Sequence, residues 1–493
     1  MSEASKEKPN IAPKQRYVGR IKIVVDEKEI TRDNLLDVLL KVLPVHWFNA
    51  QQIQYLYRYY RGDQPIYHRV KSVRPEINNI IVENRANEIV SFKTGYLMGE
   101  PVQYVARTDR KDKAKAIGRL NELTFAEDKA AKDKVLADWM HIAGQGYRIV
   151  LPDRSPDVDE APFEIFAGDP RVTFVVYSSM LGQPPLMGGS MRLTREGNWL
   201  ISIYTPARYF EVLDDVIVKD EPHMLGMIPI IEYPANEARL GAFEIVLPLL
   251  DAINNVDSNR LDDIEQIVQA LLLFHNVDID SEDYKKLREE GAIKYRDADP
   301  TMPAEIKYIV AMLSQSETQT LADHLYETVL TICGMPNRNG GTSTSDTGAA
   351  VIMRDGWSAA EARARDTELM FKQSEKEFLK LLLRICRNST AEDLGLSLAD
   401  IEVRFTRRNY ENIQQKAQVL TTMLDNDKIA PLLAFTHSGM FSDPQVAYQL
   451  SVDYQKEQQK NGEAGNAGKS PAEDDPADGE DPSEGTQRGS ETP

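Results

Sequence analysis

Cysteine is scarce in this 493-residue sequence, and clusters of metal-ligating residues are missing. The two cysteines, Cys333 and Cys386, belong to no CxxC pair and to no Cys/His cluster. The seven histidines are scattered, and none stands at ligand spacing from another. A disulfide framework and a structural zinc site are therefore not expected. This cysteine usage fits a reducing cytoplasm.

Catalytic motifs are also missing. The sequence has no GxSxG elbow, no HExxH and no GxGxxG between a strand and a helix. Gly468-Lys469-Ser470 matches the end of a phosphate-binding loop, but Glu463 stands where that loop needs its first glycine. Adjacent acidic residues such as Asp262 and Asp263 point apart on a helix. We therefore predict no catalytic residue, no metal site, no cofactor and no enzymatic activity.

Long apolar runs and a surplus of basic residues are the remaining absences. No stretch of 18 apolar residues occurs, so no membrane span is expected. The first 17 residues are polar and lack the apolar core of a secretory signal. The net charge is −19 and the pI is about 5.0. This balance argues against a DNA-coating surface, but not against a protein past which DNA moves.

The residues that are present predict a helix-rich α+β protein. Apolar spacing indicates a short strand over 18–25, then helices over 32–42, 46–61, 79–98 and 121–144, with a basic connector over 63–75. Residues 147–231 consist of short β-rich runs separated by turn residues, which is typical of antiparallel sheet. Within this part, KTGYLMGEPVQY (93–104) predicts a helix that ends at Gly99, followed by a strand.

The second half predicts long helices separated by a charged insertion and a polar loop. Helices are expected over 240–274, 313–333 and 349–387, a strand over 401–406, and helices over 412–423, 428–435 and 443–459. A loop rich in Gly, Ser, Thr and Asn covers 334–348. Residues 461–493 hold nine acidic residues against Lys469 and Arg488, and we expect this tail to be disordered.

The order of these elements resembles that of the portal (head–tail connector) proteins of siphophages. The residues that carry the resemblance are Asn84-Arg85, Ile89-Val90, the block 93–104, and the segment from Ile228-Pro229 into Asn236-Glu237. The resemblance covers roughly residues 31–459. It implies a portal fold with a wing, long stem helices, a small α/β clip, a long kinked wing helix and a helical crown.

The resemblance also implies a function and a set of partners. Portal proteins form a ring, usually of twelve subunits, at one vertex of the capsid, and double-stranded DNA is packaged and ejected through it. The expected partners are other copies of the chain, the terminase large subunit with its ATPase, the major capsid and scaffolding proteins, and head-completion or adaptor proteins. The expected location is the virion, after assembly in the cytoplasm of the host bacterium, with no membrane partner.

By position, the resemblance divides the chain into parts. They are a flexible arm (1–30), wing (31–234), stem helix (235–277), clip (278–304), return stem helix (305–333), tunnel loop (334–348), wing helix and strand (349–411), crown (412–460) and acidic tail (461–493). The expected DNA-facing residues of the tunnel loop are Asn337, Arg338, Asn339, Gly340, Gly341, Thr342, Ser343, Thr344 and Ser345. The expected docking residues of the clip are Tyr284, Lys285, Lys286, Arg288, Glu289, Glu290, Lys294 and Arg296.

Two alternatives to a portal remain open at this point. One is a helical scaffold protein that forms no channel. The other is a nuclease or hydrolase that uses scattered carboxylates with magnesium. If the chain is a portal protein, Arg338 either contributes to a basic constriction of the channel or pairs with a carboxylate of a neighbouring subunit.

Overall fold

The computed structural model describes residues 19–107, 110–153, 160–268, 271–278, 282, 285, 296–297, 301–303, 305–309, 315–337, 356–389, 393–407, 413–441 and 444–466. The chain forms two compact units, Met1–Glu411 and Asn412–Pro493. Among the described residues, no helix is both long and apolar enough to span a bilayer.

The first unit begins with a short strand and one long helix. Strand β1 (Ile23–Val25) is followed by α1 (Leu35–Tyr60), which replaces the two helices predicted over 32–42 and 46–61. Pro44 lies inside α1, and its side chain is exposed on the same helix face as that of Leu40. Water can therefore satisfy the Leu40 carbonyl that loses its hydrogen bond to position 44.

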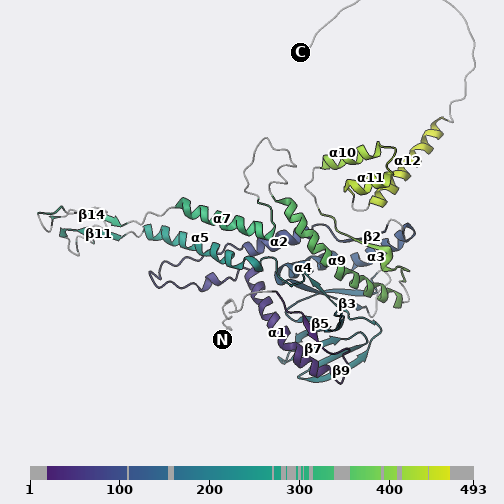
Figure 1. Ribbon diagram of the computed structural model, residues 1–493, viewed down its shortest axis with the longest axis horizontal. Coiled ribbons are helices and arrows are strands. Elements are labelled where there is room, and N and C mark those ends of the chain that lie inside the picture. The colour runs from purple at the N-terminus through teal and green to yellow at the C-terminus, as the bar shows by residue number, and fades with distance from the viewer. Residues whose placement is uncertain are drawn as a thin grey trace, which may run out of the picture. The chain divides into compact units, whose positions relative to one another are not determined.

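Two sheets and the helices packed on them form the body of this unit (Figure 1). The larger sheet has the order β1-β5-β6-β7-β8-β9, in which only β1 and β5 are parallel. The smaller antiparallel sheet has the order β10-β3-β4. The strands are β3 (Gln145–Pro152), β4 (Phe163–Gly168), β5 (Thr173–Ser178), β6 (Pro185–Leu193), β7 (Trp199–Tyr204), β8 (Arg208–Leu213), β9 (Val216–Pro222) and β10 (Ile230–Pro234).

The helices cover both sheets. Helix α1 packs on the larger sheet through Val38 and Val42, which share a core with Phe174 and Phe210. Tyr147 on β3 contacts Val175 of the larger sheet, so the smaller sheet packs against the larger one. The opposite face of the smaller sheet is covered by helices. Helices α4 (Lys129–Ala143) and α9 (Trp357–Asn388) pack against β3 and β10 and share one core with α3 (Ala114–Ala126).

The block 93–104 has the predicted order of helix and strand, with two differences. Helix α2 (Arg85–Leu97) begins at the Asn84 N-cap, six residues later than predicted, and strand β2 (Gln103–Ala106) pairs with β15 (Ile401–Arg404). Gly99 is not in the left-handed conformation that a glycine after a helix often adopts. A Cβ at this position would lie 2.5 Å from the carbonyl oxygen of Gly95, so close approach to the helix end explains the glycine.

The predicted helix over 240–274 is shorter than expected. After a 3-10 turn at Glu244–Val246, α5 runs over Leu247–Val268 with Pro248 in its first turn. Residues Leu271–His275 form strand β11, which pairs with β14 (Glu305–Ile309), and β12 (Val277–Asp278) pairs with β13 (Arg296–Asp297). Helix α7 (Gln315–Cys333) returns beside α5 (Figure 1).

The predicted helix over 349–387 corresponds to α9, and residues 349–355 lie outside the described residues. The second unit consists of α10 (Ile413–Leu424), α11 (Pro431–Ser438) and α12 (Pro444–Asn466). Phe435 stacks on Phe441 and contacts Tyr448, and it forms the small core of this unit. Helix α12 extends into the predicted tail as far as Asn466, and residues 467–493 lie outside the described residues.

Candidate functional site

The residues predicted to face DNA or to dock partners fall mostly outside the described part of the chain. Of the predicted DNA-facing residues of the tunnel loop, only Asn337 is described, and its amide nitrogen lies 3.5 Å from Glu327 Oε1 of α7. Of the predicted docking residues, Lys285 is exposed. Arg296 lies on β13, opposite Asp278 of β12 in the strand register. The other predicted residues lie outside the described part of the chain: Arg338, Asn339, Gly340, Gly341, Thr342, Ser343, Thr344, Ser345, Tyr284, Lys286, Arg288, Glu289, Glu290 and Lys294.

The described chain on both sides of 338–355 is anchored to α2. Helix α7 ends in a left-handed turn at Gly334 and the buried Met335, and α9 begins after the left-handed Gly356. The Trp357 ring at the start of α9 lies 6.0 Å from the Phe92 ring and 6.1 Å from the Tyr96 ring. Helix α2, which holds the first residues of the block 93–104, therefore supports the start of α9.

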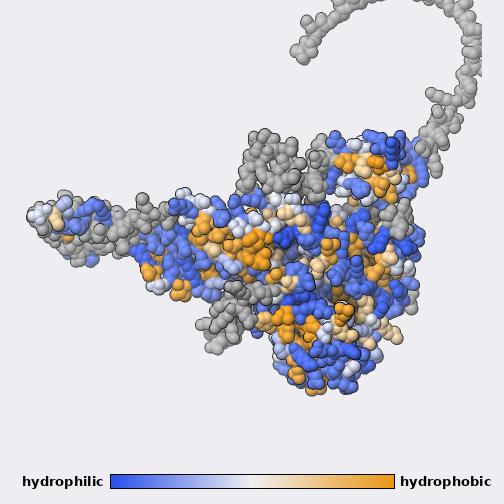
Figure 2. Space-filling view, in the orientation of Figure 1, coloured by the Kyte–Doolittle hydropathy of each residue, from blue (hydrophilic) through white to orange (hydrophobic). Residues whose placement is uncertain are grey.

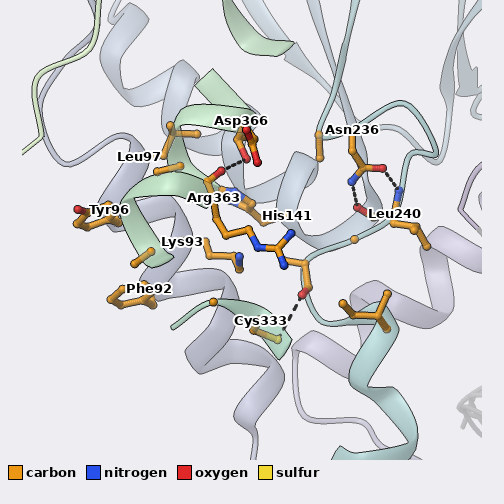
Figure 3. Close-up of a pocket in the computed structure, with 18 of the residues that line it drawn as sticks. Phe92, Lys93, Tyr96, Leu97, His141, Asn236, Leu240, Cys333, Arg363 and Asp366 are labelled. Atoms are coloured by element: carbon orange, nitrogen blue, oxygen red, sulfur yellow. Dashed lines mark hydrogen bonds between the residues drawn. The ribbon is translucent and has the colours of Figure 1, made fainter. Parts of the chain in front are cut away.

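A cavity of about 330 Å³ lies at this junction (Figure 3). It is bounded by α2, the end of α7, the first turns of α9 and the segment between β10 and α5. Lys93 and Arg363 extend into it from α2 and α9, whereas the Asp366 carboxylate lies well apart from both (Figure 3). The other side chains that Figure 3 labels in its wall are Phe92, Tyr96, Leu97, His141, Asn236, Leu240 and Cys333.

Burial controls the charge state of the groups in this wall. It lowers the pKa of Lys93, and the nearby Arg363 lowers it further. Burial and the positive Lys93 lower the pKa of His141 to about 3, and its ring lies 3.1 Å from the Thr94 hydroxyl. Burial raises the pKa of the Cys333 thiol to about 11. At neutral pH the imidazole and the thiol are therefore uncharged, and the charges that face the cavity centre are cationic.

A fully buried ionic cluster attaches α9 to the body. Glu375 accepts hydrogen bonds from Arg148 at 2.8 Å and from Lys129 at 2.9 Å, and Asp133 pairs with the same two cations. Although burial disfavours its charge, Arg148 and Lys129 lower the pKa of Glu375 to about 2. Two hydroxyls complete the cluster by donating to Glu375, those of Tyr104 at 2.6 Å and Tyr233 at 2.7 Å.

This cluster was not predicted from the sequence, although a signal was present. Arg148 interrupts the apolar run of β3, and Glu375 stands in the apolar second half of α9. A charge inside an apolar run requires a buried partner. The partner itself could not be identified, because Arg148 and Glu375 are 227 positions apart.

A second missed feature joins the extended segment 79–83 to α5. Every second residue of the segment donates a backbone N–H hydrogen bond to α5. The acceptors are side-chain oxygens at every fourth residue of the helix. The pairs are Asn79 with Asp262 Oδ1 at 2.7 Å, Ile81 with Ser258 Oγ at 3.0 Å, and Glu83 with Asn254 Oδ1 at 2.9 Å. Four helical residues rise about 6 Å and two extended residues rise about 6.6 Å, so the spacings match.

The chain also tethers its last described segment in the first unit to α9. Arg407 pairs with Glu361 at 2.9 Å and with Glu368 at 2.6 Å, two residues that lie about two turns apart on α9. Tyr96 of α2 donates to the same Glu361 at 3.0 Å. In the part of the chain that the structure describes, no three His, Cys, Asp or Glu side chains come together as a metal site.

The comparison with known families gives the identity of the chain. No curated protein sequence matches it significantly. The model of one family, described as phage portal protein, SPP1 Gp6-like, matches residues 40–464. This match spans both units, both helices that flank residues 338–355, and the block 93–104. The chain therefore belongs to the phage portal protein family of the SPP1 Gp6-like type.

Proposed function

We propose that this chain forms a ring-shaped channel at one capsid vertex, through which double-stranded DNA is packaged and later ejected. The family match over residues 40–464 carries this proposal. The paired helices α5 and α7 support it, because they provide long surfaces for repeated lateral contacts in a closed ring. Apolar side chains gather on the visible face over α7 and α2, as expected for surfaces that subunits cover (Figure 2).

Within the ring, the parts of the chain take the roles that the resemblance implies. The segment 334–348 faces the DNA, the segment 278–304 docks the terminase ATPase and then the head-completion proteins, and 412–460 forms the crown inside the capsid. The net charge of −19 keeps the channel from binding DNA strongly, because a DNA-retaining surface would be basic. Energy for translocation comes from the separate terminase ATPase.

Electron microscopy of the purified full-length chain tests the ring. We expect particles with a central hole and a uniform subunit number of about twelve, and procapsids that contain the chain should package DNA when terminase and ATP are added. An elongated particle without a hole would favour the helical scaffold. Magnesium-dependent cleavage of plasmid DNA that is lost on substitution of single Asp or Glu residues would favour the nuclease.

A further inference from the structure

The cavity between α2, α7 and α9 contains two cations that lack an anion. Within the described residues, neither the Lys93 ammonium nor the Arg363 guanidinium has an ion-pair partner. The Asp366 carboxylate also lines the cavity, but within the described residues it forms no ion pair with either cation. Two like charges in one recess repel each other, and the half-buried Lys93 also loses hydration, so an entering anion would be stabilised there.

The depth of the recess restricts which anion can enter. Lys93 is half-buried, whereas Arg363 is exposed, so the two cations lie at different depths. A volume of about 330 Å³ is near the lower end of sites that hold small ligands, roughly 300–1,000 Å³. A carboxylate on a flexible side chain can reach such a depth. The phosphates of duplex DNA lie on a convex rod and are bound by extended basic surfaces instead.

The wall of the cavity indicates a protein partner. Ile245 is 55% exposed and Ile332 is 38% exposed, and both line the cavity. Large apolar side chains exposed around a charged recess are typical of a surface that another protein covers. Portal-family chains assemble with copies of themselves, and a chain with 77 acidic and 58 basic residues presents mainly carboxylates to its neighbour.

We propose that an Asp or Glu side chain of the neighbouring copy enters this cavity and pairs with Lys93 and Arg363, while Ile245 and Ile332 pack around it. This inference rests on the proposed ring. Arg363 can donate hydrogen bonds to both carboxylate oxygens in a fork geometry, and Lys93 adds a second positive charge. The contact would fix the start of α9 against the next subunit, close to the predicted DNA-facing loop.

Zero-length cross-linking of the full chain tests this contact. Rings are assembled from a mixture of ¹⁴N- and ¹⁵N-labelled chains and treated with a carbodiimide, which joins an amine directly to a carboxylate. Mass spectrometry is expected to find Lys93 linked to an Asp or Glu of the other isotope. If Lys93 is linked only to carboxylates of its own isotope, or remains unlinked in complete rings, the proposal is wrong.

Charge variants provide the second test. Lys93→Gln and Arg363→Gln should each raise the chain concentration needed for ring assembly by roughly 10-fold or more. The matched control is Lys376→Gln, which removes an exposed positive charge from the same helix and should leave assembly unchanged. Lys93→Glu should block assembly, and reversing the cross-linked carboxylate to Lys should restore it.

Two outcomes separate this inference from the proposed function. If the wild-type chain forms rings and both Gln variants assemble normally, the inference fails and the ring stands. If those variants assemble normally but lose salt-dependent DNA retention, the cations serve DNA phosphates and the inference also fails. If the wild-type chain forms no rings at all, the proposed function itself is wrong.

Discussion

Glu375 is the residue on which most buried polar contacts of α9 converge. It accepts from two cations and two tyrosine hydroxyls, and its side chain is fully buried. The ion pairs need not make the fold more stable than an apolar core of the same shape would. The loss of one member is costly, because it leaves an opposite charge buried without a partner.

We therefore predict that Glu375→Gln or Arg148→Met lowers the free energy of unfolding by about 3–5 kcal/mol. The double variant should lose less than the sum of the two single losses, because it removes both charges together. Urea unfolding at fixed chain concentration, followed by tryptophan fluorescence, measures these values. Lys376→Gln is the control and should stay within about 0.5 kcal/mol of the wild type. A loss below about 1 kcal/mol for Glu375→Gln would contradict the assigned role.

Two buried histidines should make stability depend on pH. Burial lowers the pKa of His46 to about 4, against the opposing effect of its contact with the Arg171 carbonyl, and the pKa of His141 is about 3. Below pH 6.5 the unfolded chain binds protons at these positions and the folded chain does not. Stability is therefore lost as the pH falls from 6.5 toward 4.

At pH 5.5 each histidine should reduce the free energy of unfolding by about 1.4 kcal/mol relative to its value at neutral pH. Denaturation midpoints between pH 7 and pH 5 measure this loss. His46→Gln should make the pH dependence shallower, and the exposed His437→Gln is the control that should leave it unchanged. An unchanged slope in His46→Gln would show that this histidine is already protonated in the folded chain.

At the scale of elements, the pairing of segment 79–83 with α5 holds an extended stretch on a helix face. Asn254, Ser258 and Asp262 are buried. When one of these acceptors is removed, water cannot readily replace it as the partner of the backbone amide. We predict that Asn254→Ala or Ser258→Ala costs about 1–3 kcal/mol. Hydrogen exchange of the Ile81 and Glu83 amides should accelerate by about 10-fold or more.

The neighbouring residue supplies the control for this experiment. Asp263→Ala removes a carboxylate one position from the paired Asp262, and it should leave exchange at both amides unchanged. Equal acceleration in Asp263→Ala and Ser258→Ala would show that the helix as a whole loosens. In that case the individual acceptors would not matter.

The elements also show where prediction from sequence works. The strands β3 to β8 follow clear apolar runs bounded by turn residues, and they lie in the region predicted as antiparallel sheet over 147–231, which β3 precedes by two residues. The run Leu271–His275 was predicted to be helical, because a short apolar run is compatible with either a helix or a strand. It forms a strand because it pairs with β14, which lies about 30 residues further along the chain. The recess around Lys93 and Arg363 joins residues 270 positions apart, so no local pattern could predict it.

At the scale of the whole molecule, the predicted tunnel loop gives a prediction that depends on the proposed function. Deletion of Asn339 to Thr344 should leave ring assembly intact and impair DNA packaging. The reason is that this Gly-, Ser- and Thr-rich stretch lies between α7 and α9 in sequence, and both helices have their own contacts with α2, through Tyr326 to Glu88 and through Trp357 to Phe92. Electron microscopy and ATP-driven packaging into procapsids measure the two effects. Loss of rings in the deletion variant would assign the loop to assembly instead.

The buried cluster around Glu375 also limits how this protein can evolve. Its two cations, Lys129 and Arg148, balance its two anions, Asp133 and Glu375, on three different elements. A single inherited change at any of these positions leaves a net charge in the core, so an apolar replacement needs at least two changes to arise together. Among relatives, we expect charge to be lost from these positions in opposite pairs, and never from one position alone.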